Sequence, residues 1–112
     1  MMQDNLFQKI IDRKIPADIV YEDEHCLAFR DVNPQAPTHV LVVPRVHQPD
    51  IGSLAEADPE ATIDLLRLAR RIAEDAGGTY RLVFNTGADA QQSVFHCHAH
   101  VLAGRSLGWP PG

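Results

Sequence analysis

Near the C-terminus, apolar residues alternate with three histidines, His96, His98 and His100. Successive side chains of a β-strand point to opposite faces, so this period of two predicts a strand over residues 94–102. On a helix the same spacing would scatter the imidazoles around the axis. We therefore expect the three imidazoles to share one face of a strand. The apolar residues of the other face should pack into a core: Phe95, Cys97, Ala99 and Val101.

Two segments have the apolar period of helices. The first covers residues 5–14, with Asp4 as its predicted N-cap, and it ends before Pro16. The second covers residues 58–76, with Asp58 as its predicted N-cap and two glycines after its last residue. The apolar stripe of this second helix is long enough to cover one face of a sheet.

Four further segments are short and rich in β-branched and aromatic residues, which is typical of strands. They are residues 19–22, 26–30, 39–44 and 80–85. The third of these is apolar on both faces, which indicates a central strand. Together with the helices, this order predicts an α+β fold, with one long helix on an antiparallel sheet of about five strands and a short N-terminal helix.

The composition is that of an ordinary globular domain. A chain of 112 residues is near the usual size of one domain, and its hydrophobic and charged fractions are 45% and 22%. Its net charge of −5 is opposite in sign to a nucleic-acid-binding surface. No apolar run approaches the roughly 20 residues that span a bilayer, and the polar start is not a signal peptide. We expect one domain over residues 1–112, located in the cytoplasm, that binds neither nucleic acid nor membrane.

The two cysteines, Cys26 and Cys97, both fall within predicted strands. In a chain without a secretory signal, this placement favours buried reduced thiols over a disulfide. We therefore expect no disulfide to stabilise the fold.

The histidine row is the best candidate for chemistry, because half of the six histidines fall within it. Imidazole is partly neutral and partly cationic near pH 7, so adjacent rings can supply a nucleophile, a proton donor and an anion clamp. A metal site and a purely structural row are the alternatives. On one strand His96 and His100 would lie about 13 Å apart, whereas two nitrogens on one zinc ion lie about 4 Å apart at most. We expect no metal and no other cofactor.

Phosphoryl or nucleotidyl transfer suits such a row. Its transition state concentrates negative charge on oxygen atoms, which positioned hydrogen-bond donors or cations stabilise. A neutral histidine can also attack phosphorus and form a phosphoramidate intermediate that water then cleaves.

Residues 96–102, His-Cys-His-Ala-His-Val-Leu, resemble the signature of the histidine-triad family, in which histidines alternate with apolar residues. The sequel at residues 103–105 and the closing Trp-Pro-Pro-Gly at residues 109–112 resemble the Hint branch of that family. The likeness extends over most of the chain, through residues 15–17, 20–24, 34–39, 85–87 and 92–94. This resemblance implies the same α+β fold.

The resemblance also implies roles for the histidines. His98, central in the row, would be the nucleophile on the α-phosphorus. His96 and His39 would hold its tautomer and relay protons. His100 and Ser93 would bind the phosphate and assist departure of the leaving group.

The residues that the resemblance implies for nucleotide binding are Asp31, Asn85, Ser93, His98 and His100. Asp31 would hold the ribose hydroxyls and Asn85 would contact the phosphate. From the local sequence alone, Asp31 equally fits the start of a turn, and Asn85 and Ser93 fit turn caps. His39 equally fits a hydrogen-bonded core residue. His47 has no support from the resemblance, and we expect it to be a loop residue.

The implied reaction is hydrolysis of purine nucleoside phosphoramidates, which are adenylated amines resembling AMP-lysine. The product is a nucleoside 5′-monophosphate, formed through a nucleotidyl-histidine intermediate. Two alternatives stay open: a dinucleoside polyphosphate hydrolase of the same superfamily, and a nucleotide-binding adaptor without activity. In each case the ligand is a purine nucleotide resembling AMP or GMP, and an apolar pocket reads both purines alike.

The C-terminal tail, residues 105–112, is too short and proline-rich for another strand, yet it carries the only tryptophan, Trp109. A small domain gains from burying further area, and an aromatic anchor beside stiff prolines loses little entropy on docking. Together with the Hint resemblance, this predicts a homodimer whose tail lies near the partner's active site. The alternative is a tail that folds onto its own domain.

Overall fold

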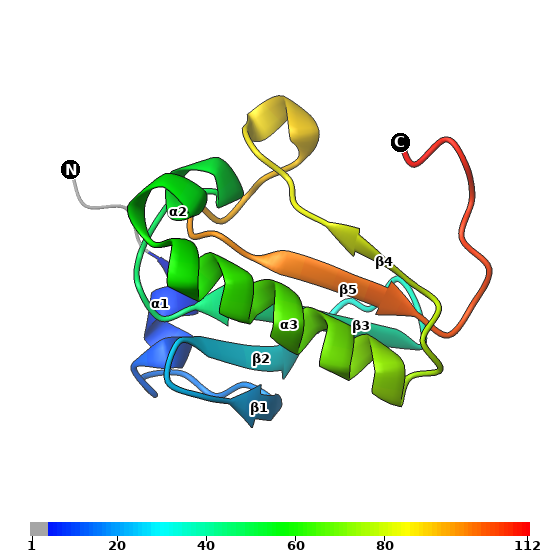
Figure 1. The fold of residues 1–112 in the computed structure, drawn as a ribbon, viewed down its shortest axis with the longest axis horizontal. Helices are drawn as coiled ribbons and strands as arrows, with labels where there is room; N and C mark the ends of the chain where they lie inside the picture. The colour runs from blue at the N-terminus through cyan, green and yellow to red at the C-terminus, as the bar shows by residue number, and fades with distance from the viewer. Residues whose placement is uncertain (1–4) are drawn as a thin grey trace.

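The computed structural model describes residues 5–112, which form one antiparallel sheet flanked by helices (Figure 1). The strands are β1 (Ile19–Glu22), β2 (Cys26–Arg30), β3 (Thr38–Pro44), β4 (Tyr80–Val83) and β5 (Ala99–Ala103), in the order β1-β2-β3-β5-β4. The helices are α1 (Leu6–Ile11), α2 (Ile51–Ala57) and α3 (Pro59–Asp75), with a 3-10 turn at Ala88–Ala90. Adjacent strands are antiparallel throughout the sheet. The predicted α+β fold is confirmed, with five strands and the long helix on one face.

The two faces of the sheet bury different side chains, because residues alternate along a strand. In β2, Cys26 and Ala28 belong to the cluster beneath α3, whereas Leu27 and Phe29 belong to a second cluster that contains Phe7 of α1. Helices α1 and α3 therefore cover opposite faces of the sheet.

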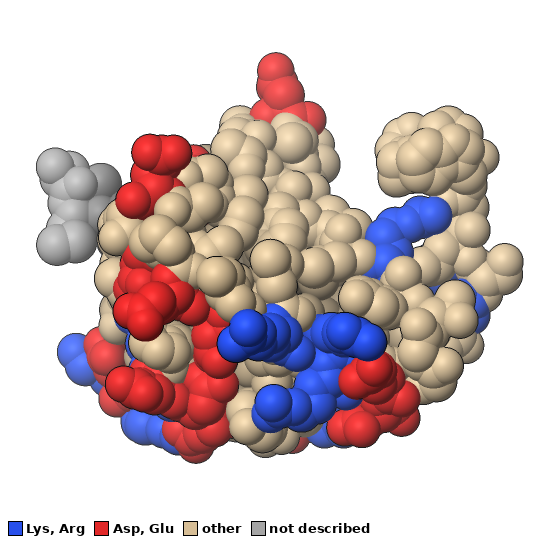
Figure 2. Space-filling model, in the orientation of Figure 1, with Lys and Arg blue, Asp and Glu red and all other residues tan. Residues whose placement is uncertain are grey.

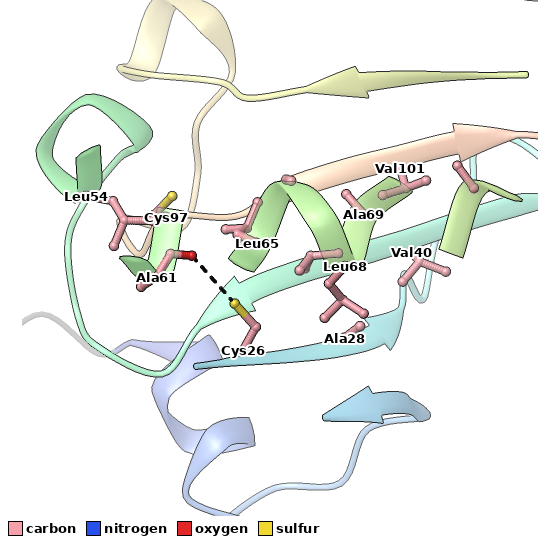
Figure 3. Close-up of a cluster of buried hydrophobic side chains, with 13 residues drawn as sticks. Cys26, Ala28, Val40, Leu54, Ala61, Leu65, Leu68, Ala69, Cys97 and Val101 are labelled. Carbon is pink, nitrogen blue, oxygen red and sulfur yellow. Dashed lines mark hydrogen bonds between the residues drawn. The ribbon is translucent and has the colours of Figure 1, made fainter. Parts of the chain in front are cut away.

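The cluster beneath α3 consists of small and branched side chains that let the helix approach the strands closely (Figure 3). Leu65 and Leu68 of α3 are almost completely buried, as is Cys97. The Cys26 thiol donates to the Ala61 carbonyl oxygen at 4.0 Å. Both cysteines are free and buried, as predicted. Burial raises the pKa of Cys97 to about 12 and also raises the pKa of Cys26, so both remain protonated thiols.

The long helix agrees with the sequence prediction, and the first helix differs at both ends. Asp58 caps α3 by accepting from the Ala61 N–H at 3.0 Å, as predicted. Helix α1 ends at Ile11, because Arg13 has a φ of 62°, which no α-helix contains. Its N-cap is Asn5. The predicted cap, Asp4, lies outside the described residues.

The sequence prediction missed α2, a short helix between β3 and α3. Asp50 caps it by accepting from the Ser53 N–H at 2.8 Å. Leu54 is the one buried residue of this helix. A single buried position gives no apolar period along the sequence, so the N-cap was the available signal.

The strand bounds agree with the predicted ones except near the histidine row. Strands β1 and β2 match, β3 begins at Thr38 rather than His39, and β4 ends at Val83 rather than residue 85. The prediction of one strand over residues 94–102 is wrong, because β5 begins only at Ala99.

The early part of the predicted strand is diverted by side-chain and loop contacts. Pro44 ends β3 and has no N–H to offer a ladder. Its carbonyl oxygen accepts from His96 Nε2 at 2.8 Å, and the Cys97 N–H donates to the Gln48 carbonyl oxygen at 2.7 Å. His96 and His98 therefore precede β5, and the prediction that all three imidazoles lie on one strand is wrong.

The apolar residues of the predicted strand are buried beneath α3 with one exception. Cys97, Ala99 and Val101 belong to the cluster beneath that helix, as predicted. Phe95 is 37% exposed, so its predicted place in the core is wrong. Phe95 precedes β5, in a stretch that belongs to no strand, so no strand pairing directs its side chain toward the face beneath α3.

The outer face of α3 carries charges of both signs, with acidic side chains flanking the basic ones (Figure 2). Arg67, Arg70 and Arg71 are exposed, and Arg70 lies 3.3 Å from Glu74. Over residues 5–112, no helix has both the length and the apolar character needed to cross a membrane.

Candidate active site

Strands β3 and β5 are adjacent, and their antiparallel register pairs His39 with Leu102, which makes His100 the diagonal neighbour of His39. The two rings have centroids 5.2 Å apart, and His39 Nε2 lies 2.9 Å from His100 Nδ1. His98 follows on the other side, with its ring centroid 5.1 Å from that of His100. Three of the four histidines predicted from the sequence thus form one continuous imidazole cluster.

The hydrogen bonds around His39 fix the positions of its proton and that of His100. The Gln35 N–H donates to His39 Nδ1 at 3.0 Å, so this nitrogen carries no proton. The proton of neutral His39 is therefore on Nε2, from which it is donated to His100 Nδ1. His100 in turn carries its own proton on Nε2, where it is available to a ligand.

His98 has the opposite tautomer. Its Nδ1 lies 2.8 Å from the His96 carbonyl oxygen, which can only accept, so the proton is on Nδ1. His98 Nε2 then has a free lone pair, which is the state a nucleophilic imidazole needs. The ring of Phe7 packs edge-on against it, with centroids 4.8 Å apart and planes at 84°. The ring is thus fixed both in tautomer and in place.

His96 is fully buried and contacts other groups than the sequence implies. Its Nε2 donates to the Pro44 carbonyl oxygen at 2.8 Å, which leaves Nδ1 as an acceptor. The side-chain nitrogen of Asn5 lies 3.0 Å from that Nδ1, and His47 Nδ1 also lies 3.0 Å away. The contact of His96 with His98 runs through its backbone carbonyl and not through its imidazole.

Burial sets the charge of the cluster. It lowers the pKa of His39, His96 and His98, and it lowers the pKa of His100 to about 4, with the neighbouring imidazoles His98 and His39 adding to the effect. Asp31 opposes this shift at His39, His98 and His100. All four rings are therefore neutral at pH 7 in the free protein, so none is a cationic anion clamp before a ligand arrives.

Asp31 serves the turn and the cluster together. Its Oδ1 accepts from the Asn33 N–H at 2.8 Å, which is the turn contact that the local sequence allowed. Its Oδ2 lies 3.3 Å from His39 Nε2. One carboxylate thus starts the loop after β2 and supplies the negative charge nearest to the His39–His100 pair.

Asn85 and Ser93 make no side-chain hydrogen bond to the imidazoles in the described part of the chain. Within residues 5–112, neither side chain makes a hydrogen bond to another residue, and Ser93 is exposed. They border a loop that is held by Gln92, a buried polar residue that the sequence analysis did not single out. Gln92 Oε1 accepts from the Gly87 N–H at 2.8 Å, and its Nε2 donates to the Pro49 carbonyl oxygen at 2.6 Å.

The sequence analysis also missed two residues behind His96. His47 is in a loop, as predicted, but its Nδ1 reaches His96 Nδ1, and its ring centroid lies 5.0 Å from that of His96. Asn5 contacts both rings through its side-chain nitrogen. A histidine three residues after the end of β3 was the one signal available, and no local pattern connects residue 5 with residue 96.

A cavity of about 400 Å³ touches the imidazole cluster at His39 and lies mainly on the α3 side of the sheet. It is lined by α3, by β1 and β3 and by the loop that begins at Asp31, and Val20, Leu68 and Ile72 of its wall pack in the α3 cluster. Most of the cavity therefore lies on the opposite side of β3 from His98. The imidazole cluster, and not this cavity, is the candidate site for chemistry.

Two groups in the described chain have atoms close enough to hold a metal ion. One is Asp31, His39 and His100, and the other is Asp23, Cys26 and Asp64. In the first group His39 and His100 already hydrogen-bond to each other, and a cation there would have to replace that bond. His96, His98 and His100 do not form such a group among residues 5–112.

An antiparallel five-stranded sheet that carries a cluster of neutral, tautomer-fixed imidazoles at β3 and β5 is the architecture expected of a histidine-triad protein. The chain belongs to that family: the HIT domain model matches residues 12–107.

Sequence relatives match over nearly the full length. The chain is 50% identical to an uncharacterized HIT-like protein of Synechocystis, with all of both chains covered. It is 48% identical to a 14 kDa zinc-binding protein of Zea mays, over 96% of this chain and 87% of that protein.

Solved structures agree with the fold. A HIT family hydrolase from Legionella pneumophila has a TM-score of 0.92 at 44% identity, covering 97% of this chain and all of that one. A histidine triad protein from Clostridium difficile has a TM-score of 0.87 at 36% identity, covering 96% of each chain.

Proposed function

We propose that this protein is a nucleotide-binding hydrolase that cleaves purine nucleoside phosphoramidates and belongs to the Hint branch of the family. The observation that carries the proposal is the state of His98: a neutral ring whose Nδ1 proton is held by the His96 carbonyl and whose Nε2 lone pair is free. Similarity to proteins described as HIT family hydrolases supports the hydrolytic part.

In the proposed reaction, His98 Nε2 attacks the α-phosphorus while the bond between phosphorus and the amine breaks. Arrival of the anionic phosphate favours uptake of a proton by the His39–His100 pair, and the nearby carboxylate of Asp31 offsets that charge. The departing amine takes this proton and leaves as a neutral amine. Water then attacks phosphorus and gives a proton to the His39–His100 pair, the bond to Nε2 breaks, and a nucleoside 5′-monophosphate and neutral His98 result.

The remaining residues have proposed positions around the nucleotide. Asp31 holds the ribose hydroxyls, for which a carboxylate is a double acceptor. Asn85 contacts the phosphate, and Ser93 helps the leaving group together with His100. Because Ser93 is exposed and the Asn85 side chain makes no hydrogen bond to another residue of 5–112, both side chains are available to a ligand. No metal or cofactor takes part in this proposal.

Turnover tests the proposal against its rivals. We expect wild-type protein to hydrolyse adenosine 5′-phosphoramidate faster than a diadenosine polyphosphate, with no loss of rate in excess chelator. The reverse order of rates would identify a dinucleoside polyphosphate hydrolase, and loss of fold or activity with chelator would identify a zinc protein. Nucleotide binding without any turnover would leave a non-enzymatic adaptor.

We further propose that residues 1–112 form one HIT domain that acts in the cytoplasm as a homodimer. β4 is an edge strand of the sheet, and Ile63 and Leu66 of α3 are apolar and substantially exposed. Exposed strand edges and apolar patches favour association. A cytoplasmic location is consistent with the free thiols of Cys26 and Cys97.

The tail supports the same proposal. The tail leaves the sheet after β5 (Figure 1). Trp109 is 82% exposed, and an exposed tryptophan is suited to be buried in an interface with a partner. Arg81 Nη2 donates to the Gly108 carbonyl oxygen at 2.7 Å, and its guanidinium lies 6.0 Å from the Trp109 ring centroid. Sedimentation should give twice the 12.4 kDa chain mass. A monomer at micromolar concentration, or unchanged kinetics on several amines after deletion of residues 106–112, would contradict this part.

A further inference from the structure

Asn5 connects the first turn of α1 with two imidazoles behind the candidate active site. Its side-chain oxygen accepts from the Phe7 and Gln8 N–H groups, both at 3.1 Å, which is the N-cap contact of the helix. This contact settles the orientation of the amide, because the oxygen must face the helix. The NH₂ group then faces His47 Nδ1 at 3.1 Å and His96 Nδ1 at 3.0 Å.

The direction of the contact with His96 follows from the other side of that ring. His96 Nε2 must carry a proton, because the Pro44 carbonyl oxygen 2.8 Å away can only accept. Neutral His96 therefore has a bare Nδ1, and Asn5 is a donor that matches it. His47 Nδ1 also lies 3.0 Å from this nitrogen and is a second donor to it when its own proton is on Nδ1. Because His96 is fully buried, a lone pair left without these donors would cost stability.

The same segment fixes the proposed nucleophile. The carbonyl oxygen of His96 accepts the Nδ1 proton of His98, so the place of His96 determines the tautomer and position of His98. Phe7, whose N–H is capped by Asn5, packs edge-on against His98. Asn5 is thus connected to His98 in two ways, through His96 and through Phe7.

We propose that Asn5 is a positioning residue of the histidine site, which holds His98 in its reactive tautomer through His96 while it caps α1. The kinetic part of this inference rests on the proposed hydrolase function, and the structural part does not. Asn5 touches neither substrate nor reacting atoms, so its effect should appear as a change in kcat with little change in KM.

The test compares Asn5→Asp with Gln8→Glu. Aspartate caps helices as well as asparagine does, so α1 should remain intact. It replaces the NH₂ donor by a carboxylate that faces His96 Nδ1 and His47 Nδ1. Gln8→Glu makes the same change of charge one turn along α1, where the side-chain amide donates to Asp12 instead. Long-range ¹H–¹⁵N spectra of the imidazoles give tautomer and charge for each ring without any substrate.

For Asn5→Asp we expect His96 or His47 to become an imidazolium at pH 7 and the Nδ1–H tautomer of His98 to lose its dominance. The kcat for adenosine 5′-phosphoramidate should fall about tenfold with KM within about twofold, less than the hundredfold that a displacement of 1 Å can cause. Gln8→Glu should leave the spectra and kcat near wild type. If Asn5→Asp fails to fold, Asn5→Ser, which also caps but is too short to bridge both rings, takes its place with the same expected loss of the His98 tautomer.

Imidazole spectra in Asn5→Asp that match wild type would overturn the inference, as would equal effects of Asn5→Asp and Gln8→Glu. Absence of phosphoramidate turnover in wild-type protein would refute the proposed function instead. In that case the tautomer of His98 in the two variants still decides whether Asn5 positions it.

Discussion

The segment from Cys97 to Ala103 separates two environments that hold their side chains by different means. On the α3 face, Cys97, Ala99 and Val101 are small, apolar and buried among leucines, and close packing is their main interaction. On the other face, His98 and His100 are also largely buried, but hydrogen bonds to a carbonyl and to another imidazole fix each ring. The comparison teaches that burial packs apolar side chains on both faces of the sheet, and that on the α1 face it also keeps the imidazoles neutral.

The largest effect should follow from removing the His98 imidazole, which carries the nucleophilic lone pair. His98→Gly is expected to lower turnover of adenosine 5′-phosphoramidate by about 10⁶-fold, because nucleophile removal in other hydrolases leaves only binding and electrostatic catalysis. Thermal stability should also fall, since the largely buried His98 ring packs edge-on against both Phe7 and His100. Calorimetry gives the temperature below which the variant is folded, and steady-state kinetics are measured there. Turnover near the wild-type rate in folded His98→Gly protein would contradict the role of His98.

The opposite face should show a different result. Leu65→Ala removes a fully buried side chain beneath α3 and should lower the free energy of unfolding by about 2–5 kcal/mol. The turnover of the folded fraction should stay within a few-fold of wild type. Denaturant unfolding measures the first and kinetics at low temperature the second. A large loss of turnover in folded Leu65→Ala protein would mean that the faces are not independent.

Neutral imidazoles also predict the dependence of stability on pH. Burial lowers the pKa of these rings in the folded protein, so below the ordinary value of 6.5 the unfolded chain binds more protons than the folded one. This contribution is intact above pH 6.5 and is lost as the pH falls toward 4. For His100, whose pKa moves from 6.5 to about 4, the change corresponds to about 3 kcal/mol at most.

The control for this prediction is His100→Asn, which removes one of the proton-binding rings and leaves the carboxylates unchanged. Its free energy of unfolding should depend less steeply on pH between 6.5 and 4 than that of wild type. Parallel curves for the two proteins would show that His100 does not titrate with a lowered pKa.

The smallest effect concerns the carboxylate at the edge of the cluster. Asp31→Asn removes the negative charge 3.3 Å from His39 Nε2, so the pKa of His39 should fall further below its ordinary value. If Asp31 also holds the ribose, KM for the nucleotide should rise by about tenfold, the equivalent of one lost charged hydrogen bond. Imidazole titration and steady-state kinetics measure these separately. An unchanged KM would show that Asp31 does not bind the ribose and that its role is limited to the turn and to His39.

The sequence predicts a helix or strand well where one local feature, such as an N-cap or an apolar period, determines it. The helix capped by Asp58, the strands β1 and β2 and the buried face of β5 all follow from periodicity and capping. The start of β5 does not, because the Pro44 carbonyl is taken by a side chain rather than by the ladder. A strand pattern in the sequence cannot show which acceptor an imidazole will occupy.

The candidate site divides in the same way. The spacing of residues 96–100 and the resemblance it carries predict the histidines, and the structure brings His39, His98 and His100 together. Asn5, His47 and Gln92 act through contacts between segments far apart in the chain, which no local pattern encodes. The charge state of the rings also depends on burial, and burial becomes known only with the fold.

The most direct test of the central claim is the mass of the protein itself during turnover. Wild-type protein mixed with adenosine 5′-phosphoramidate, quenched within a few turnovers and measured intact, should contain an adenylated species whose fragments place the nucleotide on His98. Alkaline handling without hydroxylamine protects the phosphorus–nitrogen bond of the adduct. His98→Gly should show no adenylated species. Active wild-type protein that never carries the adduct at any quench time, or carries it on another residue, would contradict the account.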